Sequence, residues 1–581
     1  MMTPKRVYLR LKNVHFKVQS TVRQLKHRGK RLSLELGIAS LLLGLAGAPG
    51  RAAEQVYFNV GALEFSVSVQ DLQTFAKEGK AYSDLALIVN RLTPDQRTRL
   101  RNLLSTQYKF SPVLMSRFFY SPLGERLLTY MGELIQLKDG QNGFYGIRAA
   151  LIQASADPEG LSAINFIRKF PTNIQLNTGR IRQQMSQVST LLEETEALVA
   201  RLKQLALASQ AAESTIDFAQ LPDPKTVGQY KYVQQTKKLF DAARQREFLV
   251  QLYLPELPIG AQAAVVVITN GIGTKLDRYD YLAEHLASHG FAIAILQHPD
   301  SDDRQQQAFL QGLSGAMFKS TAYLDRPQDV TYLLNELERL NSSEFGDRLD
   351  LQKVGIFGNS FGGDTALSLA GAEINFDQLE KDCSAQKNLV KLSLLVQCHA
   401  LDLPRRPYTF RDRRIKAASV LFPGSSSLFG QTGLSQIQIP VLWGAVSKDL
   451  FSPLVLDQMP AFNWLGTPDK YLVVATGIDH LNLNFYALRN LKTLDKEAAD
   501  AVTIKEPEIV KSYVKALNLA FFQVYLVGNT AYRPYLSASY AQSISEASYN
   551  LLLLKSLSEI YSDGNASFPP QRPKRQYSNP I

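Results

Sequence analysis

The sequence predicts an α/β fold in which a mostly parallel sheet carries helices on both faces, preceded by a mainly helical N-terminal domain. From about residue 230, apolar runs rich in β-branched residues alternate with segments of helical spacing. This alternation is typical of parallel strands buried between two layers of helices. The predicted strands are Phe248–Leu254, Ala264–Thr269, Phe291–Leu296, Val354–Phe357, Ala417–Phe422, Val441–Val446 and Tyr471–Val474, and the helices between or after them are Tyr279–Ser288, Pro327–Leu340, Phe361–Ala372 and Ile509–Leu526.

Residues 54–180 show a different pattern and are predicted to form the helical domain. Two short β-like runs, Val56–Asn59 and Leu63–Val67, come first. Helix starts are then expected where Ser, Thr or Asp precedes Pro, because the side-chain oxygen caps free N–H groups and Pro suits the first helical position. These pairs are Thr93-Pro94, Ser111-Pro112, Ser121-Pro122 and Asp157-Pro158.

A longer amphipathic helix connects the two parts. Its mainly apolar positions recur at spacings of three and four, which predicts a packed or bridging helix: Val188, Leu191, Thr195, Leu198, Leu202 and Leu205. We therefore assign 181–229 to a bridging helix and linker, and 230–565 to the α/β domain. The proline-rich residues 566–581 are predicted to be a disordered tail.

The positive charge of the chain lies at its ends. The 581 residues carry a formal net charge of +11, with ten Lys or Arg and no acid in residues 1–31 and three more basic residues in 572–575. Without these two segments the net charge is −2, so the predicted domains lack the basic face of a nucleic-acid-binding protein. Hydrophobic residues make up 45% and charged residues 20%, as in folded globular proteins.

Residues 1–53 are predicted to be a signal or targeting segment. The run Leu36–Ala48 holds no charge, follows the basic stretch and precedes small residues, as in secretory signals. It is shorter than the roughly 20 residues of a spanning helix. We expect an exported protein, periplasmic or extracellular, whose mature chain begins near residues 49–54 and is free or loosely bound to a membrane. The alternatives are an anchor formed by an uncleaved signal and an ordinary buried helix.

One motif indicates nucleophilic catalysis. The predicted strand Val354–Phe357 continues into Gly358-Asn359-Ser360-Phe361-Gly362 and then a predicted helix. At such a strand-to-helix turn, glycines permit a sharp reversal that exposes the serine oxygen. Serine is a weak nucleophile unless a base removes its proton. Ser360 is therefore the candidate nucleophile, and a base and an acid are expected later in the chain.

His480 is the candidate base, because it is the one of the seven histidines that follows the last predicted strand. Asp449, after the strand Val441–Val446, is the candidate acid that orients the imidazole. Another aspartate remains open as the acid, although Asp479 is badly placed to face the ring of its neighbour. The backbone N–H groups of Phe361 and of Ile272, in the turn Asn270–Gly273, are the expected oxyanion donors.

The sequence contains no phosphate-binding loop, metalloprotease helix motif or Cys-x-x-Cys. In the glycine-containing turn after the Ala264–Thr269 strand, Leu276 stands where a dinucleotide-binding loop would have its third glycine. We therefore expect no cofactor and no metal.

These motifs resemble those of a known group of hydrolases. Residues 230–545 resemble exported bacterial α/β hydrolases related to platelet-activating-factor acetylhydrolase, through Gly271–Gly273, Ala283–Phe291, Gly358–Gly363, Asp449 and His480. Residues 54–180 and 533–540 resemble cyanobacterial-type α/β hydrolases with an uncharacterised N-terminal helical domain. The resemblance implies the α/β-hydrolase fold and a Ser-Asp-His esterase.

The chain departs from that pattern in two ways. Asn270 stands where His usually precedes the glycine, and Val446 stands where Gly is common before the acid. In the acetylhydrolases proper the acid lies earlier, at the place of Phe422-Pro423 here. These departures leave both Asp449 and another aspartate open as the acid.

The sequence thus predicts a serine-dependent ester hydrolase, carboxylesterase- or lipase-like, acting through an acyl-enzyme on a small ester or a lipid such as a phospholipid or short-acyl lipid ester. The alternatives are a peptidase or polyester hydrolase of the same fold, and a non-catalytic envelope or binding protein.

The chain has two cysteines, Cys383 and Cys398. Export would favour a disulfide between them, because oxidising compartments let disulfides persist. Free buried thiols, or a metal-binding or catalytic role, are the alternatives. A bridge would pin a polar loop to the packed segment that follows the apolar run Leu392–Val396.

Overall fold

The computed structural model describes residues 52–213, 215–384, 390–477 and 507–555. Nearly all of the predicted signal segment 1–53 and the whole predicted tail 566–581 lie outside these residues. Within the described ranges, no helix has both the length and the apolar composition that crossing a membrane requires.

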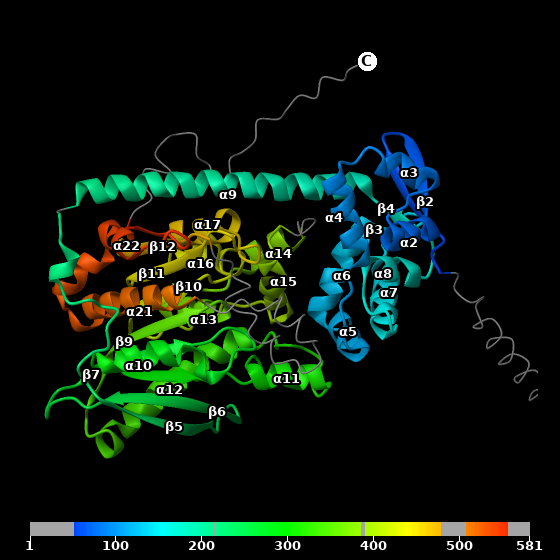
Figure 1. The fold of residues 1–581 in the computed structure, drawn as a ribbon. Coiled ribbons are helices and arrows are strands. Elements are labelled where there is room, and N and C mark those ends of the chain that lie inside the picture. Colours follow the sequence, from blue (N-terminus) through cyan, green and yellow to red (C-terminus); the bar gives the residue numbers. More distant parts are fainter. Residues whose placement is uncertain (1–51, 214, 385–389, 478–506, 556–581) are drawn as a thin grey trace, which may run out of the picture.

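A nine-stranded sheet forms the centre of the larger domain (Figure 1). Its spatial order is β13-β12-β11-β10-β9-β7-β8-β6-β5. The six strands from β12 to β8 run parallel, whereas β6, β5 and β13 pair antiparallel at the two edges. The strands are β5 (Tyr232–Asp241), β6 (Arg246–Pro255), β7 (Ala263–Thr269), β8 (Ala292–Leu296), β9 (Leu349–Asn359), β10 (Ile415–Leu421), β11 (Val441–Val446), β12 (Lys470–Ala475) and β13 (Leu551–Leu554).

All seven strands predicted in this domain are present, and two more occur at the edges. β5 was missed because most of its residues are exposed or partly buried and four of them are Lys or Gln, a composition that is typical of an edge strand. β13 is a run of only four leucines after the last predicted helix, too short to be told from a helical segment by periodicity.

Helices cover both faces of the sheet. On one face, α12 (Ala322–Glu344) and α13 (Phe361–Ala370) share a core with the bridging helix. On the other, α10 (Asp280–Ser288) and α21 (Glu508–Phe522) form a second core with Phe357 and Val266. Shorter helices complete the domain: α11 (Asp303–Gln311), α14 (Phe376–Ser384), α15 (Ser393–Gln397), α16 (Ser426–Leu434), α17 (Met459–Asn463) and α22 (Ala538–Ile544).

The N-terminal domain is mainly helical and also contains a four-stranded sheet of order β2-β1-β4-β3. The two short β-like runs of the sequence form its strands β1 and β2. The strands are β1 (Gln55–Val60), β2 (Leu63–Ser68), β3 (Ile135–Leu137) and β4 (Ile174–Leu176); the helices are α2 (Val69–Glu78), α3 (Ser83–Val89), α4 (Pro94–Ser105), α5 (Pro112–Phe119), α6 (Pro122–Leu134), α7 (Phe144–Ala156) and α8 (Ala163–Lys169).

Three of the four predicted capped starts in this domain begin helices. Thr93, Ser111 and Ser121 accept backbone N–H bonds at the starts of α4, α5 and α6, each with Pro in the first helical turn. The expectation for Asp157-Pro158 is wrong. Asp157 instead closes a turn in which its carbonyl accepts from Gly160 N–H at 2.8 Å, and the positive φ of Gly160 ends that turn before α8 begins.

The predicted bridging helix is α9 (Thr178–Ala212), which runs from the N-terminal domain along the α/β domain (Figure 1). Leu191, Leu198, Leu202 and Leu205 are buried in the core that α12 and α13 share. Val188, at the same spacing, is 38% exposed. The apolar stripe therefore packs only from Leu191 onward.

Candidate active site

Ser360 lies in a sharp turn between β9 and α13. Its backbone has φ +52° and ψ −122°, a region that non-glycine residues rarely adopt and that is common at functional sites. Only glycine fits at the flanking positions 358 and 362, because the backbone of other segments approaches them too closely for a side chain. A Cβ on Gly358 would lie 2.2 Å from the carbonyl oxygen of Gly362, and one on Gly362 would lie 2.0 Å from that of Thr269.

The turn after β7 packs directly against this elbow. A Cβ on Gly271 would lie 3.2 Å from Asn359 Oδ1, in the residue before Ser360. Gly273 has φ +68°, and its N–H donates to Ser301 O at 2.8 Å. The structure thus brings the turn that carries Ile272 next to the start of α13, where Phe361 lies. These are the two segments that were predicted to supply the oxyanion donors.

Asp449 lies at the same edge of the sheet, after β11. Because β7, β9, β10, β11 and β12 are parallel, their carboxyl ends meet at one edge. Asp449 is buried, and its Oδ1 accepts the N–H groups of Phe451 at 2.9 Å and Ser452 at 2.8 Å. The turn therefore fixes the carboxylate. His480, the predicted base, and Asp479 lie outside the described residues, beyond the end of β12 at Ala475.

The alternative position for the acid, after β10, holds no carboxylate. Phe422 there has φ +37° and is followed by Pro423, Gly424 and three serines. A buried aspartate from another segment, Asp457, reaches this region and accepts the N–H of Ser426 at 3.0 Å. Sequence reasoning missed Asp457, since nothing near it in the chain indicates a partner.

Asp457 is the centre of a buried polar cluster that links three loops. Its carboxylate accepts the hydroxyls of Ser393 at 2.6 Å and Ser452 at 2.7 Å, and Lys391 lies at 3.4 Å. Burial raises the pKa of Asp457, but Lys391 and the hydrogen bonds outweigh it and hold that pKa below its ordinary value. Because the Ser452 N–H also donates to Asp449 Oδ1, the cluster supports the loop that carries Asp449.

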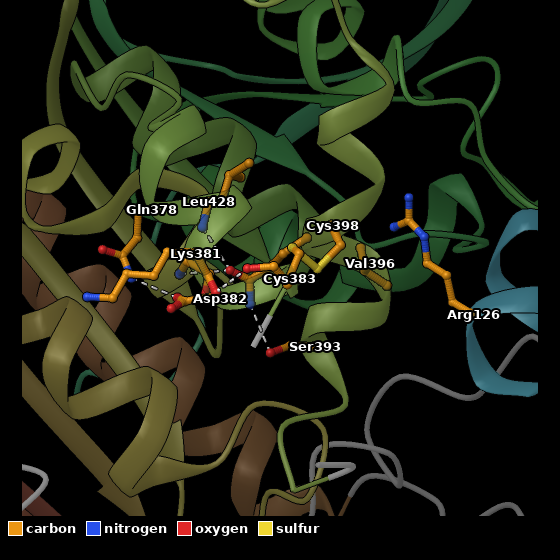
Figure 2. Close-up of a disulfide and its surroundings, with 12 residues drawn as sticks. Arg126, Gln378, Lys381, Asp382, Cys383, Ser393, Val396, Cys398 and Leu428 are labelled. Carbon is orange, nitrogen blue, oxygen red and sulfur yellow. Dashed lines mark hydrogen bonds between the residues drawn. A yellow bond between two sulfur atoms is a disulfide. The ribbon is translucent and has the colours of Figure 1, made fainter. Parts of the chain in front are cut away.

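A disulfide joins Cys383 to Cys398, with 5.8 Å between the Cα atoms. Figure 2 shows Ser393 and Leu428 near this bridge, each at one end of a dashed hydrogen bond. The bonds run through Gln397, whose Nε2 donates to Ser393 Oγ and whose Oε1 accepts the Leu428 N–H, both at 2.9 Å. Ser393 N–H donates to Phe451 O at 2.6 Å. The bridge therefore closes the loop that contacts the segment holding Asp449.

Replacing both Cys383 and Cys398 by Ser is expected to lower the free energy of unfolding by about 3 kcal/mol, the chain-entropy value for a loop of this size. The loop spans 15 residues. Urea unfolding of the variant and the unreduced protein measures the difference. Alkylation of the native protein, denatured without reductant, should label neither cysteine; two labelled cysteines would contradict the bridge.

Two aromatic rings pack against the ring of Phe361. Its ring centroid lies 4.7 Å from that of Tyr323 and 5.5 Å from that of Phe318. Phe318 also lines a small hollow between the two domains, whose walls are mostly apolar. The hollow is lined by Ser121, Pro122, Leu123, Arg126, Ala316, Met317, Phe318, Leu395 and His399. The start of α6 and the segment around α15 thus both line the hollow next to Phe318, which contacts Phe361.

A comparison with protein families gives a match. A family described as "Alpha/beta hydrolase of unknown function (DUF1400)" matches residues 52–177. The protein has an α/β-hydrolase fold. The matched residues form the N-terminal domain, whereas the nine-stranded sheet and Ser360 lie after them. No curated protein matches the chain.

In the described part of the chain, no three His, Cys, Asp or Glu side chains gather into a group able to hold a metal ion. The arrangement there offers a serine with strained backbone, a neighbouring turn with backbone N–H groups and a buried carboxylate. Groups of these kinds can take part in acyl transfer.

Two buried histidines make the stability of the fold dependent on pH. Burial lowers the pKa of His285 to about 3, helped by the charges of His289 and Lys515, and lowers that of His298 to about 4. Each imidazole is neutral in the folded protein but takes up a proton in the unfolded chain below its ordinary pKa of 6.5. Stability is therefore lost as the pH falls from 6.5 toward 4.

Replacing His285 by Leu should make the unfolding free energy less steeply dependent on pH. Between about pH 4.5 and 6 the slope should fall by about 1.4 kcal/mol per pH unit, the value of one proton. Urea unfolding at several pH values measures both slopes. Equal slopes for the two proteins would show that His285 is protonated in the folded state.

Proposed function

We propose that the protein is a serine hydrolase that cleaves the ester bond of a lipid or other small ester. The observation that carries the proposal is Ser360, held at φ +52° with the Ile272 turn packed against its elbow. Such geometry costs conformational energy and is retained where it serves a site. Asp449 at the same edge supports a Ser-Asp-His triad with His480 as base.

In the proposed reaction, Ser360 Oγ attacks the ester carbonyl carbon and its proton passes to His480. The carbonyl oxygen becomes an oxyanion that accepts the N–H groups of Ile272 and Phe361. The carbon–oxygen bond to the alcohol then breaks, and the alcohol leaves with the proton from His480. Water attacks the acyl-enzyme, giving its proton to His480, and the acid leaves as Ser360 regains a proton. Asp449 orients the imidazole and stabilises its charged form.

The surroundings of Phe361 favour an acyl group of apolar character. Phe318 contacts the Phe361 ring, and Met317, Pro122 and Leu123 share the neighbouring hollow. In this proposal the N-terminal domain and the insertion 374–414 restrict the entrance to the site. Apolar walls bind the acyl chain by excluding water.

We further propose that the protein is exported and works outside the cytoplasm, free or loosely attached to a membrane. The disulfide supports this location, since disulfides persist in oxidising compartments. The basic and then apolar residues before 53 support it as well. Mass spectrometry of the native protein should find a first residue near 49–54; a soluble cytoplasmic form that retains Met1 would refute it.

A panel of p-nitrophenyl esters of increasing acyl length, together with a phospholipid, tests the function on the purified native protein. Hydrolysis that depends on acyl length, with covalent labelling of Ser360 by a fluorophosphonate, is the expected result. Cleavage of peptides or polyesters alone would replace the ester proposal with the peptidase or polyester alternative. Binding without any turnover or labelling would favour a non-catalytic protein.

A further inference from the structure

A buried guanidinium lies directly behind the elbow and the Ile272 turn. Arg326, in the second turn of α12, is only 1% exposed. Its Nη2 donates to Thr269 Oγ1 at 3.0 Å and to the carbonyl oxygen of Asn270. Thr269 ends β7 and Asn270 begins the turn, so Arg326 holds the near end of the segment that carries Ile272.

The same guanidinium holds the far end of that turn. Its Nη1 donates to Ser301 Oγ at 3.0 Å, and the carbonyl of Ser301 accepts the N–H of Gly273 at 2.8 Å. Ile272 therefore lies between two points of the backbone that are both connected to Arg326.

Arg326 also reaches the segment that carries the second donor. Its Nε donates to Thr365 Oγ1 at 3.0 Å, and Thr365 Oγ1 donates to the carbonyl of Phe361 at 3.1 Å. The guanidinium carbon lies 4.9 Å from the centroid of the Phe361 ring. One side chain thus connects the Ile272 turn with the first residue of α13.

We propose that Arg326 is a positioning residue that sets the separation of the two oxyanion donors, Ile272 N–H and Phe361 N–H. This inference rests on the proposed function, because it concerns the same reaction. Oxyanion donors act only when they lie within hydrogen-bond distance of the developing charge. A shift of about 1 Å at such a site lowers the rate by about 100-fold.

A second set of buried groups fixes Thr269 against Arg326. Arginine can only donate, so the Thr269 hydroxyl accepts from Arg326 and gives its own hydrogen to His298 Nε2, which lies 2.9 Å away. His298 Nδ1 then carries a hydrogen and donates to Asp329 Oδ2 at 3.1 Å.

Asp329 is held in turn by Arg246 Nε at 2.8 Å and Arg244 Nη2 at 2.9 Å. Arg326 can only donate to the Thr269 hydroxyl, and His298 Nε2 can accept from it, so the direction of the Thr269 hydroxyl hydrogen is determined. Burial lowers the pKa of His298, which keeps Nε2 able to accept.

Lysine cannot replace Arg326 in this arrangement. Its ammonium is a compact group on a flexible stem, whereas the planar guanidinium presents a rigid set of donors in fixed directions. Arg326→Lys keeps the charge but cannot reach Thr269, Ser301 and Thr365 together. The substitution therefore tests positioning rather than charge.

The experiment compares Arg326→Lys with the native protein on one p-nitrophenyl ester and with one fluorophosphonate. We expect kcat and the rate of Ser360 labelling each to fall about 100-fold, with KM changed less than about threefold, as for loss of an interaction made in the transition state. The control is Arg414→Lys. Arg414 is also mostly buried and paired, with Asp412 at 2.7 Å, but it precedes β10 at the opposite edge of the sheet. This control should keep both rates.

A second pair of variants, at Thr269, tests the proposal even if Arg326→Lys does not fold. Thr269→Ser retains the bridging hydroxyl and should keep kcat and the labelling rate near the native values. Thr269→Val removes that hydroxyl and should lower both rates by about tenfold, less than the roughly 100-fold loss expected for a donor displaced by about 1 Å. Equal rates for Ser and Val, or native rates in folded Arg326→Lys, would overturn the proposal.

The two proposals can fail separately. If the native protein cleaves no ester but its Ser360 reacts with the fluorophosphonate, the ester function is wrong and the labelling rates of the variants decide the role of Arg326. If the native protein cleaves no ester and its Ser360 is not labelled, both proposals are wrong.

Discussion

Replacing Ser360 by Ala is expected to lower kcat for ester hydrolysis by about 10⁶-fold, the loss found on removing the nucleophile of a comparable triad. Without Oγ no acyl-enzyme forms. Only water can then attack the ester carbonyl, with the oxyanion donors still in place. The fold should be retained, because Ala differs from Ser only by the hydroxyl and meets the same backbone strain at φ +52°. Initial rates with a short-chain aryl ester, together with thermal melting, measure the two effects.

A serine elsewhere on the same helix provides the control. Ser368 is buried on α13, well after the elbow, so Ser368→Ala should keep the native kcat. His480→Ala should be as inactive as Ser360→Ala, and the double variant scarcely worse, because the two residues act as a unit. A Ser360→Ala protein that still cleaves short-chain esters at the native rate would remove Ser360 from the mechanism.

The second large effect concerns the acid. Asp449→Asn is expected to lower kcat by about 10⁴-fold, as when an amide replaces a triad carboxylate and leaves the histidine in the wrong tautomer. The local turn should survive, since the amide oxygen can still accept the N–H groups of Phe451 and Ser452 that Asp449 now accepts. Steady-state kinetics on the same ester measure the loss.

Asp479→Asn separates the two candidate acids. Asp479 adjoins His480 in the sequence, whereas Asp449 follows a strand end, as the orienting acid must, so replacing Asp479 should affect kcat far less. If Asp479→Asn were the more damaging change, Asp449 would be a structural residue of its loop and the acid would have to be assigned elsewhere.

The sequence alone predicted those features that depend on neighbouring residues. The apolar runs predicted seven buried strands because a strand covered on both faces must be apolar along its whole length. The glycines around Ser360 predicted the elbow, because only residues without a Cβ tolerate such close backbone contacts. Capped helix starts followed the same local reasoning. Asp157-Pro158 failed because the same two residues also suit a tight turn, and Gly160 decides between the two outcomes.

What only the tertiary structure decided is how distant residues are paired in the interior. Arg326 contacts Thr269 across 57 positions of the chain, and His298 contacts Asp329 across 31. Asp457 joins Ser393 across 64 positions. No local pattern marks such residues, because a buried charged group is stable only through partners that the fold supplies. The sequence by itself determined that Ser360 would sit at a strand-to-helix turn. The packing of α12 behind that turn decided what holds the two oxyanion segments together, since a hydrogen-bonded guanidinium depends on positions in space rather than on order along the chain.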